Sequence, residues 1–245
     1  MVDALVILDG ATDPEPSTLS EAEMPALRRL RDGGSTEWVE LLDPGVPVGS
    51  ETAIASLLGW RPTGPVDRAL VEAAARGSEG PVRRVDLDGG HRLLVFGDAT
   101  LESEAITRTW PPGAQPPRIL DRGTVIIGAP GAATGLGALM GARIVVPPGA
   151  TGRPRSDLAG KRRATIDAIR GGATRVVVHV GGADAAAHDR DRSAKIAVLE
   201  AADRTLIGPL ADEIGRLTVC ADHGCDPATG RHLGGLVPMV RWSAA

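Results

Sequence analysis

Residues 175–188 read RVVVHVGGADAAAH: a β-branched apolar run, two glycines, an aspartate and, four residues later, a histidine. A short continuous run of this kind is typical of a strand buried on both faces of a parallel sheet. Similar runs recur along the chain with helical patterns between them, so we expect an α/β fold with a mostly parallel sheet between two helical layers. The expected strands are Ala4–Leu8, Thr124–Ile127, Ala142–Val146, Arg175–Val180 and Leu217–Ala221; the expected helices are Met24–Asp32, Ala132–Met140, Ser156–Arg170 and Ser193–Ile214.

The middle of the chain follows a different pattern. A short helical stretch is followed by two apolar runs separated by Asp88-Gly89-Gly90, which is a hairpin signal. We therefore expect residues 65–119 to form a small cap inserted into a core made of residues 1–64 and 120–245. The cap would contain a helix at Val66–Arg76 and strands at Pro81–Leu87 and His91–Phe96, and the C-terminal Leu236–Ala245 would add one edge strand to the core.

Composition excludes several classes of function. The 245 residues carry 27 basic and 31 acidic side chains, a net charge of −4 that argues against nucleic acid or an anionic membrane as a partner. Two cysteines exclude a disulfide scaffold, and no apolar run approaches the roughly 18 residues of a membrane span. The start, MVDALVILDG, carries acids where a signal peptide carries basic residues. We expect a cytoplasmic protein acting on a small molecule; its oligomeric state stays open.

Candidate metal ligands directly follow three of the expected strands. Asp9 follows the first, Asp184 and His188 follow Arg175–Val180, and Asp222 and His223 follow Leu217–Ala221, with His232 nine residues later. The carboxyl ends of parallel strands meet at one edge of a sheet, so these side chains can converge there. Three carboxylates and three imidazoles suit two Zn²⁺ or Mn²⁺ ions better than Ca²⁺. Taken singly, such an aspartate is more often a helix cap, and His91 and His179 are interpreted as surface or core residues.

A hydroxyl near such metals could form a covalent intermediate. Residues 47–53, PVGSETA, place Ser50 at a glycine turn that opens an expected helix, Glu51–Leu58. Backbone N–H groups there would favour a phosphate, but Ser50 could equally be the N-cap of that helix. The residues alone leave both interpretations open.

Five segments in the same order resemble the cofactor-independent phosphoglycerate mutases, most closely their archaeal-type branch, within the alkaline phosphatase superfamily. The Asp-x3-His and Asp-His combination is specific to the superfamily, and Pro-Gly-Ala-Thr-Gly points to the mutases. The segments are VILDG (6–10), GSETA (49–53), VPPGATG (146–152), VHVGGAD (178–184) continuing to His188-Asp189, and ADH (221–223).

The resemblance implies an alkaline-phosphatase-like core with two divalent metals, usually Mn²⁺ or Zn²⁺. It implies that Ser50 is the nucleophile that becomes phosphoserine. Lys161, by its spacing from the Pro-Gly-Ala-Thr-Gly loop, would neutralise a phosphate oxygen, although it also fits a solvated helix residue. One metal would be held by Asp9, Ser50, Asp222 and His223, the other by Asp184, His188 and His232.

Departures from the family shape the functional prediction. Members carry a longer second domain whose arginines hold the glycerate, whereas the cap here spans only residues 65–119, and Glu51 and Ile54 replace a usual Asp and a common His. A small cap excludes water less well, which favours hydrolysis of the phosphoserine. We therefore predict a phosphatase, with a phosphomutase on a phosphoglycerate-like or phosphonate substrate as the alternative and a non-catalytic metal-binding scaffold as a third possibility. The cap arginines, none matching a family motif, are Arg68, Arg76, Arg83, Arg84, Arg92 and Arg108.

Two weaker signals remain. Gly131–Gly137 follows a strand and opens a helix, but lacks the spacing of a dinucleotide-binding loop, so close helix–sheet packing is expected. Cys220 is expected in a buried strand, and Cys225 is expected to be a loop thiol near the metals.

Overall fold

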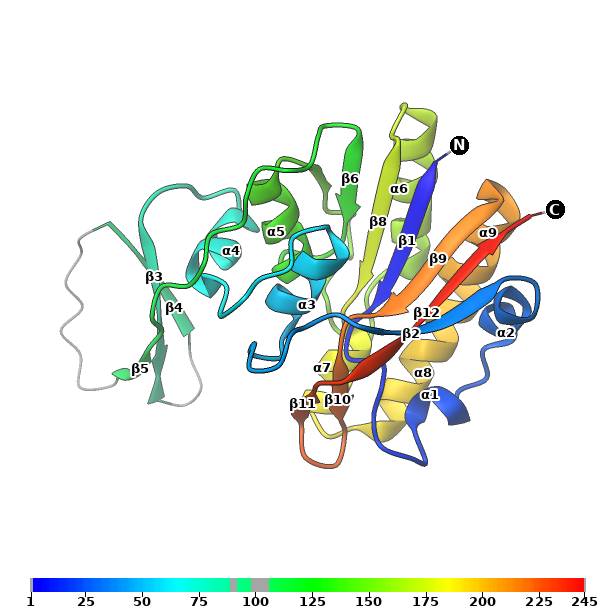
Figure 1. Ribbon diagram of the computed structural model, residues 1–245, viewed down its shortest axis with the longest axis horizontal. Coiled ribbons are helices and arrows are strands. Elements are labelled where there is room, and N and C mark those ends of the chain that lie inside the picture. The colour runs from blue at the N-terminus through cyan, green and yellow to red at the C-terminus, as the bar shows by residue number, and fades with distance from the viewer. Residues whose placement is uncertain (1, 89–91, 98–105, 245) are drawn as a thin grey trace.

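A seven-stranded sheet forms the centre of the computed structural model, which describes residues 2–88, 92–97 and 106–244 (Figure 1). Strands β1, β6, β7, β8 and β9 run parallel to one another, while β12 is antiparallel to both of its neighbours. The strand order is β2 (Ser35–Glu40), β12 (Leu236–Ser243), β9 (Arg216–Ala221), β1 (Asp3–Leu8), β8 (Arg175–Val180), β6 (Thr124–Ile127) and β7 (Arg143–Val145).

Helices cover both faces of this sheet. Helix α5 (Ala132–Met140) leads from β6 outward to β7, and α6 (Leu158–Arg170) leads from β7 back to β8. Right-handed crossovers in opposite directions place these two helices on opposite faces. Helix α3 (Ser50–Leu57) packs on α5, whereas α2 (Pro25–Asp32) and a π-helical turn at Asp203–Ile207 pack on the α6 side. The expected α/β fold with a mostly parallel sheet is confirmed.

The buried strands explain why this sheet forms. Val6, Ile7, Ile127 and Val176 are all fully buried, as expected for strands covered on both faces. Three further helices belong to the core: α1 (Thr18–Glu21), α7 (Gly182–His188) and α8 (Arg192–Ala202). In the part of the chain that is described, no helix is both long and apolar enough to cross a membrane.

The prediction of a C-terminal edge strand is wrong. Strand β12 forms, but it lies second in the sheet, between β9 and β2, and β2 is the edge. Strand β2 has no burial pattern in its sequence, because five of its six residues are exposed. Its place depends on pairing with a segment about 200 residues away, which local patterns do not reveal.

The expected helix Ser193–Ile214 is interrupted rather than continuous. It consists of α8, the π-helical turn Asp203–Ile207 and α9 (Gly208–Ile214). The buried Asp203 carboxylate accepts hydrogen bonds from the backbone N–H groups of Ala26 and Leu27, in the first turn of α2. The turn therefore satisfies donors that would otherwise remain unpaired at the start of α2.

A second, smaller sheet lies in residues 65–119, the segment predicted to be a cap. It has the order β4 (Arg92–Phe96), β3 (Val82–Leu87) and β5 (Ile106–Thr109), all antiparallel, and follows helix α4 (Arg68–Ala74). The expected pairing of the two runs in a hairpin is confirmed, although Gly89, Gly90 and His91 lie outside the described residues. Strand β5 was not expected. Figure 1 shows the cap to the left of the core, far from both chain termini.

Helix α4 docks the cap onto α5 through a glycine. A Cβ atom added at Gly135 would lie 2.0 Å from the Val71 carbonyl oxygen, and one at Gly137 would lie 2.4 Å from Ile126 Cγ1. The expected role of Gly131–Gly137 in close packing is therefore confirmed, on the cap side as well as on the sheet side.

Candidate metal centre and active site

The seven predicted metal-ligating side chains lie together at the carboxyl ends of β1, β8 and β9. Asp9 follows β1, α7 carries two of them after β8, and two more follow β9. His232 comes from β11 (Arg231–Leu233), which pairs with β10 (Gly224–Asp226), and Ser50 is the first residue of α3. The set comprises Asp9, Ser50, Asp184, His188, Asp222, His223 and His232.

The first cluster surrounds the Ser50 hydroxyl. Ser50 Oγ lies 3.2 Å from Asp9 Oδ1 and 3.2 Å from His223 Nε2. His223 Nε2 is also 3.3 Å from Asp9 Oδ1 and 3.5 Å from Asp222 Oδ2. The N-cap of α3 is Gly49, so the interpretation of Ser50 as the N-cap is wrong and its side chain faces the carboxylates instead.

The second cluster is built on α7 and β11. Asp184 and His188 lie one helical turn apart, with His188 Nε2 3.3 Å from Asp184 Oδ2. His232 Nε2 lies 3.4 Å from Asp184 Oδ1 and 2.9 Å from His188 Nε2. The two clusters adjoin, because the His223 and His232 rings are 4.3 Å apart between centroids.

All three imidazoles are held in the same way. Nδ1 of His188 lies 2.9 Å from the Gly230 carbonyl, Nδ1 of His223 lies 3.0 Å from that of Gly224, and Nδ1 of His232 lies 3.2 Å from that of Val48. A carbonyl only accepts, so each Nδ1 carries the proton and donates it. The lone pair of each Nε2 then points into the site, which is the arrangement of a metal-ligating histidine.

The residues fit divalent cations. With both Nδ1 atoms protonated, the facing Nε2 atoms of His188 and His232 bring two lone pairs together, which a cation between them would stabilise. Each cluster also contains one buried carboxylate oxygen without a hydrogen-bond partner: Asp184 Oδ1 in one and Asp222 Oδ2 in the other. Buried polar atoms of this kind normally have a partner, so these two oxygens are free to bind metal.

Charge in the site shifts the pKa values of its members. Burial, followed by the negative charge of Asp9, raises the pKa of Asp222 to about 7. Burial alone would lower the pKa of His223, but the carboxylates of Asp222 and Asp9 outweigh it and raise the pKa to about 9. Burial likewise acts to raise the pKa of Asp184, yet the adjacent imidazoles of His188 and His232 lower it well below its usual range. The carboxylates therefore attract positive charge, which imidazolium supplies when no metal does.

Gly10 allows the two clusters to approach. Its φ is +63°, and a Cβ atom there would lie 2.8 Å from Asp184 Cβ and 2.8 Å from Asp184 Oδ1. Its backbone N–H donates to Asp222 Oδ1 at 3.0 Å. Only glycine fits this position without moving the carboxylates.

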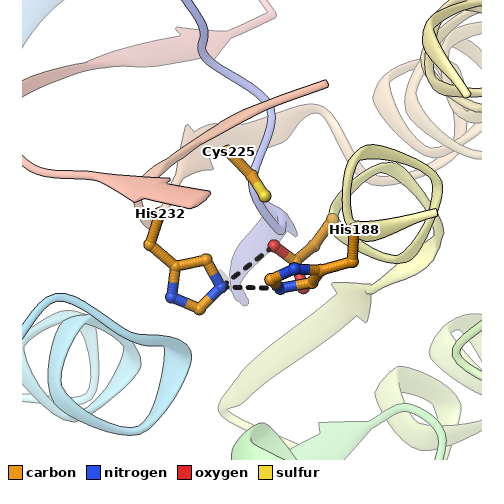
Figure 2. Close-up of side chains that lie close together, drawn as sticks. His188, Cys225 and His232 are labelled. Atoms are coloured by element: carbon orange, nitrogen blue, oxygen red, sulfur yellow. Dashed lines mark hydrogen bonds and ion pairs between the residues drawn. The ribbon is translucent and has the colours of Figure 1, made fainter. Parts of the chain in front are cut away.

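His179 is a site residue that the sequence analysis missed. It was interpreted as a surface or core residue, but its Nε2 lies 3.0 Å from Asp9 Oδ2 and its side chain lines the active-site cavity. One feature of the sequence could have identified it: His179 lies near the carboxyl end of the strand that Asp184 and His188 follow. Cys225, expected near the metals, is fully buried beside Asp184, His188 and His232 (Figure 2).

Lys161 is not among the side chains that line the cavity. It is fully buried, so it is not a solvated helix residue, and its Nζ donates to the His179 carbonyl oxygen at 2.6 Å. Burial lowers the pKa of Lys161 to about 8, although the negative charge of Asp9 acts in the opposite direction. Its ammonium group thus lies behind His179, and a contact with phosphate stays an untested prediction.

A cavity of about 630 Å³ separates the metal-ligating side chains from the cap. Ser50, Asp9 and His179 line it on the core side. The cap side consists of a helix face and part of β4, and it presents both charged and apolar side chains. These are Arg68, Val71, Glu72, Arg76, Leu93, Leu94 and Phe96.

Comparison with known proteins places the chain in a family. Residues 2–245 match the sequence model of the Metalloenzyme superfamily. The chain therefore belongs to the metalloenzyme superfamily, in agreement with the two clusters of side chains that could hold metal ions.

The resemblance to phosphoglycerate mutases is also confirmed by relatives. The chain is 34% identical over 120 residues to the 2,3-bisphosphoglycerate-independent phosphoglycerate mutase of Ignicoccus hospitalis, and 36% identical over 95 residues to that of Methanothrix thermoacetophila. These matches cover 48% and 36% of this chain but only 28% and 24% of the relatives. The similarity thus spans less than a third of either relative.

Solved structures share the fold along nearly the whole chain. The PH0037 protein of Pyrococcus horikoshii superposes with a TM-score of 0.81 at 22% identity, covering 99% of this chain and 85% of that one. The cofactor-independent phosphoglycerate mutase of Thermoplasma acidophilum superposes with a TM-score of 0.61 at 17% identity, covering 99% and 90%. At such identities the likeness concerns the fold.

Proposed function

We propose that this protein is a metal-dependent phosphohydrolase that cleaves a small phosphate monoester through a phosphoserine at Ser50. The observation that carries the proposal is the position of Ser50 Oγ, 3.2 Å from both Asp9 Oδ1 and His223 Nε2 at the floor of the cavity. A hydroxyl among carboxylates and inward-facing imidazoles is the arrangement expected of an activated nucleophile.

The ligand sets fit two divalent ions, Zn²⁺ or Mn²⁺. When bound, the ions would lower the pKa of the Ser50 hydroxyl and neutralise charge on the phosphate and on the leaving oxygen. One ion would be held by Asp9, Ser50, Asp222 and His223, and the other by Asp184, His188 and His232.

The protein residues orient the nucleophile. His179 Nε2 holds Asp9 Oδ2 at 3.0 Å, which leaves Asp9 Oδ1 directed at Ser50 Oγ. The Ser50 hydroxyl gives up its proton to solvent as Oγ forms a bond to phosphorus, the bond between phosphorus and the ester oxygen breaks, and the leaving alcohol takes up a proton from solvent. Water then attacks phosphorus, the bond to Ser50 Oγ breaks, and phosphate and free serine result.

The side chains of the cap favour hydrolysis of the phosphoserine over transfer of the phosphoryl group back to the substrate. Of the cap arginines whose side chains are described, Arg68 and Arg76 line the cavity, and both are engaged. Arg68 lies 3.5 Å from Glu51 and 3.2 Å from Glu72, and Arg76 donates to the Glu72 carbonyl oxygen at 2.8 Å. A mutase must retain a dephosphorylated, anionic intermediate, and Arg68, already paired with two carboxylates, would hold an anion poorly.

An intramolecular phosphomutase is the second candidate. It is favoured by the phosphoglycerate mutases of Ignicoccus hospitalis and Methanothrix thermoacetophila, which share part of their sequence with this chain. Incubation with 3-phosphoglycerate separates the two, because a mutase yields 2-phosphoglycerate and a phosphatase yields free phosphate.

The nucleophile is tested with p-nitrophenyl phosphate in the presence of Mn²⁺ or Zn²⁺. We expect Ser50→Ala to lower kcat by about 10⁴-fold or more, as for other nucleophiles, and acid-quenched wild-type enzyme to carry phosphate on Ser50. Ser56→Ala is the matched control, because Ser56 lies on the same helix and its hydroxyl donates to the Thr52 carbonyl oxygen. Undiminished activity of Ser50→Ala would refute the assignment.

A further inference from the structure

Cys225 lies directly opposite His232 in the β10–β11 hairpin. Residues paired across two antiparallel strands project from the same face of the ribbon. A hairpin that presents His232 to the second cluster therefore presents Cys225 to it as well. Figure 2 shows His188, Cys225 and His232 close together, and Asp184 belongs to the same group of possible metal ligands.

The main chain of Cys225 is held on both sides. Its N–H donates to the Thr12 carbonyl oxygen at 2.8 Å, and its carbonyl oxygen accepts from Lys195 Nζ at 2.7 Å. Lys195 is itself fully buried and paired with Asp13 at 2.8 Å. Cys225 is 0% exposed, so its thiol is fixed inside the site rather than free to turn to solvent.

These four side chains have the spacing of a metal site. One ligand atom from each of Asp184, His188, Cys225 and His232 can be chosen so that all lie within 4.8 Å of one another. Bonds of about 2.0–2.3 Å to a tetrahedral zinc ion place its ligand atoms roughly 3–4 Å apart. Small side-chain movements suffice to bring the four onto one ion.

We propose that the Cys225 thiolate is the fourth ligand of the second metal ion and makes this site selective for Zn²⁺ over Mn²⁺. On binding, the sulfur–metal bond forms and the thiol proton is released to solvent. The carboxylate of Asp184 and the thiolate together balance the charge of the ion, beside two neutral imidazoles. Thiolate is a soft ligand that favours Zn²⁺, whereas Mn²⁺ favours oxygen.

This inference rests on the second metal site proposed above, but not on whether the reaction is hydrolysis or phosphoryl return. A phosphate would then add as a fifth ligand, an expansion that zinc sites allow.

The test is optical and uses Co²⁺ in place of zinc. A Co²⁺–thiolate bond produces an intense charge-transfer absorption in the near ultraviolet, which oxygen and nitrogen ligands do not. The chain has two cysteines, so Cys220→Ser is the matched control for Cys225→Ser. Cys220 is buried in β9, and its Sγ lies 2.9 Å from the Ala221 carbonyl oxygen.

We expect the band in wild-type protein and in Cys220→Ser, and its loss in Cys225→Ser. The ratio of Zn²⁺ to Mn²⁺ affinity, measured by competition with a chelator, should fall at least about 10-fold in Cys225→Ser, since even changes outside the ligand shell cost that much. X-ray absorption of the wild-type zinc protein supplies a measurement that needs no variant, with sulfur expected at about 2.3 Å.

Two results would overturn the inference: stoichiometric Co²⁺ without the band in wild type, or a band that survives in Cys225→Ser. Failure of the wild-type protein to bind any divalent ion would instead overturn the proposed function, so the two failures are distinguishable.

Discussion

The metal centre and the cap face each other across one cavity but are built differently. The centre stands on the ends of three parallel strands whose last three residues are buried, and its side chains are fixed by backbone carbonyls and by one another. The strands of the cap are more exposed, and its charged side chains gather around Trp110, whose ring centroid lies 4.5 Å from Arg84 Cζ and 3.6 Å from Arg108 Cζ. We therefore expect reactivity to depend on the sheet edge, and the choice of leaving group to depend on a cap that can change without disturbing the candidate metal ligands.

Gly10→Ala tests whether the metal centre depends on the close approach of its two clusters. A methyl group would collide with Asp184 at 2.8 Å and push the two clusters apart. We expect kcat/KM to fall by about 10²-fold or more, since misplacement by about 1 Å has that effect. Gly45→Ala is the control, because Gly45 also has a positive φ of +88° but has open space around it. Equal losses in both variants would point to backbone strain rather than to the collision.

Arg84→Met would show whether the cap is a separate module. Arg84 is buried and lies 2.9 Å from Glu72 and 3.2 Å from Asp86. Its removal should destabilise the cap by about 3 kcal/mol, the lower end for a broken buried pair. Hydrogen exchange should accelerate in β3 and β5 and stay unchanged in β1 and β8. Acceleration spread evenly over both sheets would contradict the comparison.

Phe96→Ala tests whether the cap contributes to the choice of leaving group. Phe96 is the chain's single phenylalanine, and it is 42% exposed and lines the cavity. We expect kcat/KM to fall about 10-fold for p-nitrophenyl phosphate, a loss typical of a missing apolar contact, and to stay unchanged for methyl phosphate. Leu236→Ala, an exposed apolar residue outside the cavity lining, should leave both substrates unaffected. A parallel loss for both esters would exclude a role in selecting the leaving group.

Lys161→Met tests whether the buried lysine next to His179 changes the pH dependence of stability. It should have the smallest effect of these variants. Because burial lowers the pKa of Lys161 to about 8, the folded protein loses this proton at a pH where the unfolded chain still holds it. The unfolded state then binds more protons, so the free energy of unfolding rises with pH between about 8 and 10, by at most about 1.4 kcal/mol per pH unit. Thermal unfolding across that range should show this rise in wild type and not in Lys161→Met. Identical slopes would mean that the lysine titrates normally.

Local sequence patterns predicted the strands that are buried in the sheet and the residues that follow them. Strands β6 and β8 match their expected ranges to the residue, because continuous β-branched runs have few alternatives to a buried strand. The ligands after β1, β8 and β9 could be predicted because parallel strand ends share one edge of the sheet.

Features that depend on distant partners could not be predicted. Strand β2 is exposed and becomes a strand only by pairing with β12. His179 resembles any core residue until β1 brings Asp9 beside it, and the sequence around Lys161 does not reveal that its Nζ donates to the His179 carbonyl oxygen. The carbonyls that orient the three metal-ligating imidazoles belong to the backbone, so residue identity carries no sign of them.

The position of β12 inside the sheet has a consequence for synthesis on the ribosome. Glu37 of β2 and its partner Arg241 of β12 are 204 positions apart. At about 5–20 residues per second, β2 waits roughly 10 to 40 seconds for the strand that joins it to the sheet. During that time the nascent chain carries an unpaired segment with Trp38 at its centre. Glu37 and Glu40, which flank the tryptophan, are charges of the kind that keep such a segment from pairing with another chain.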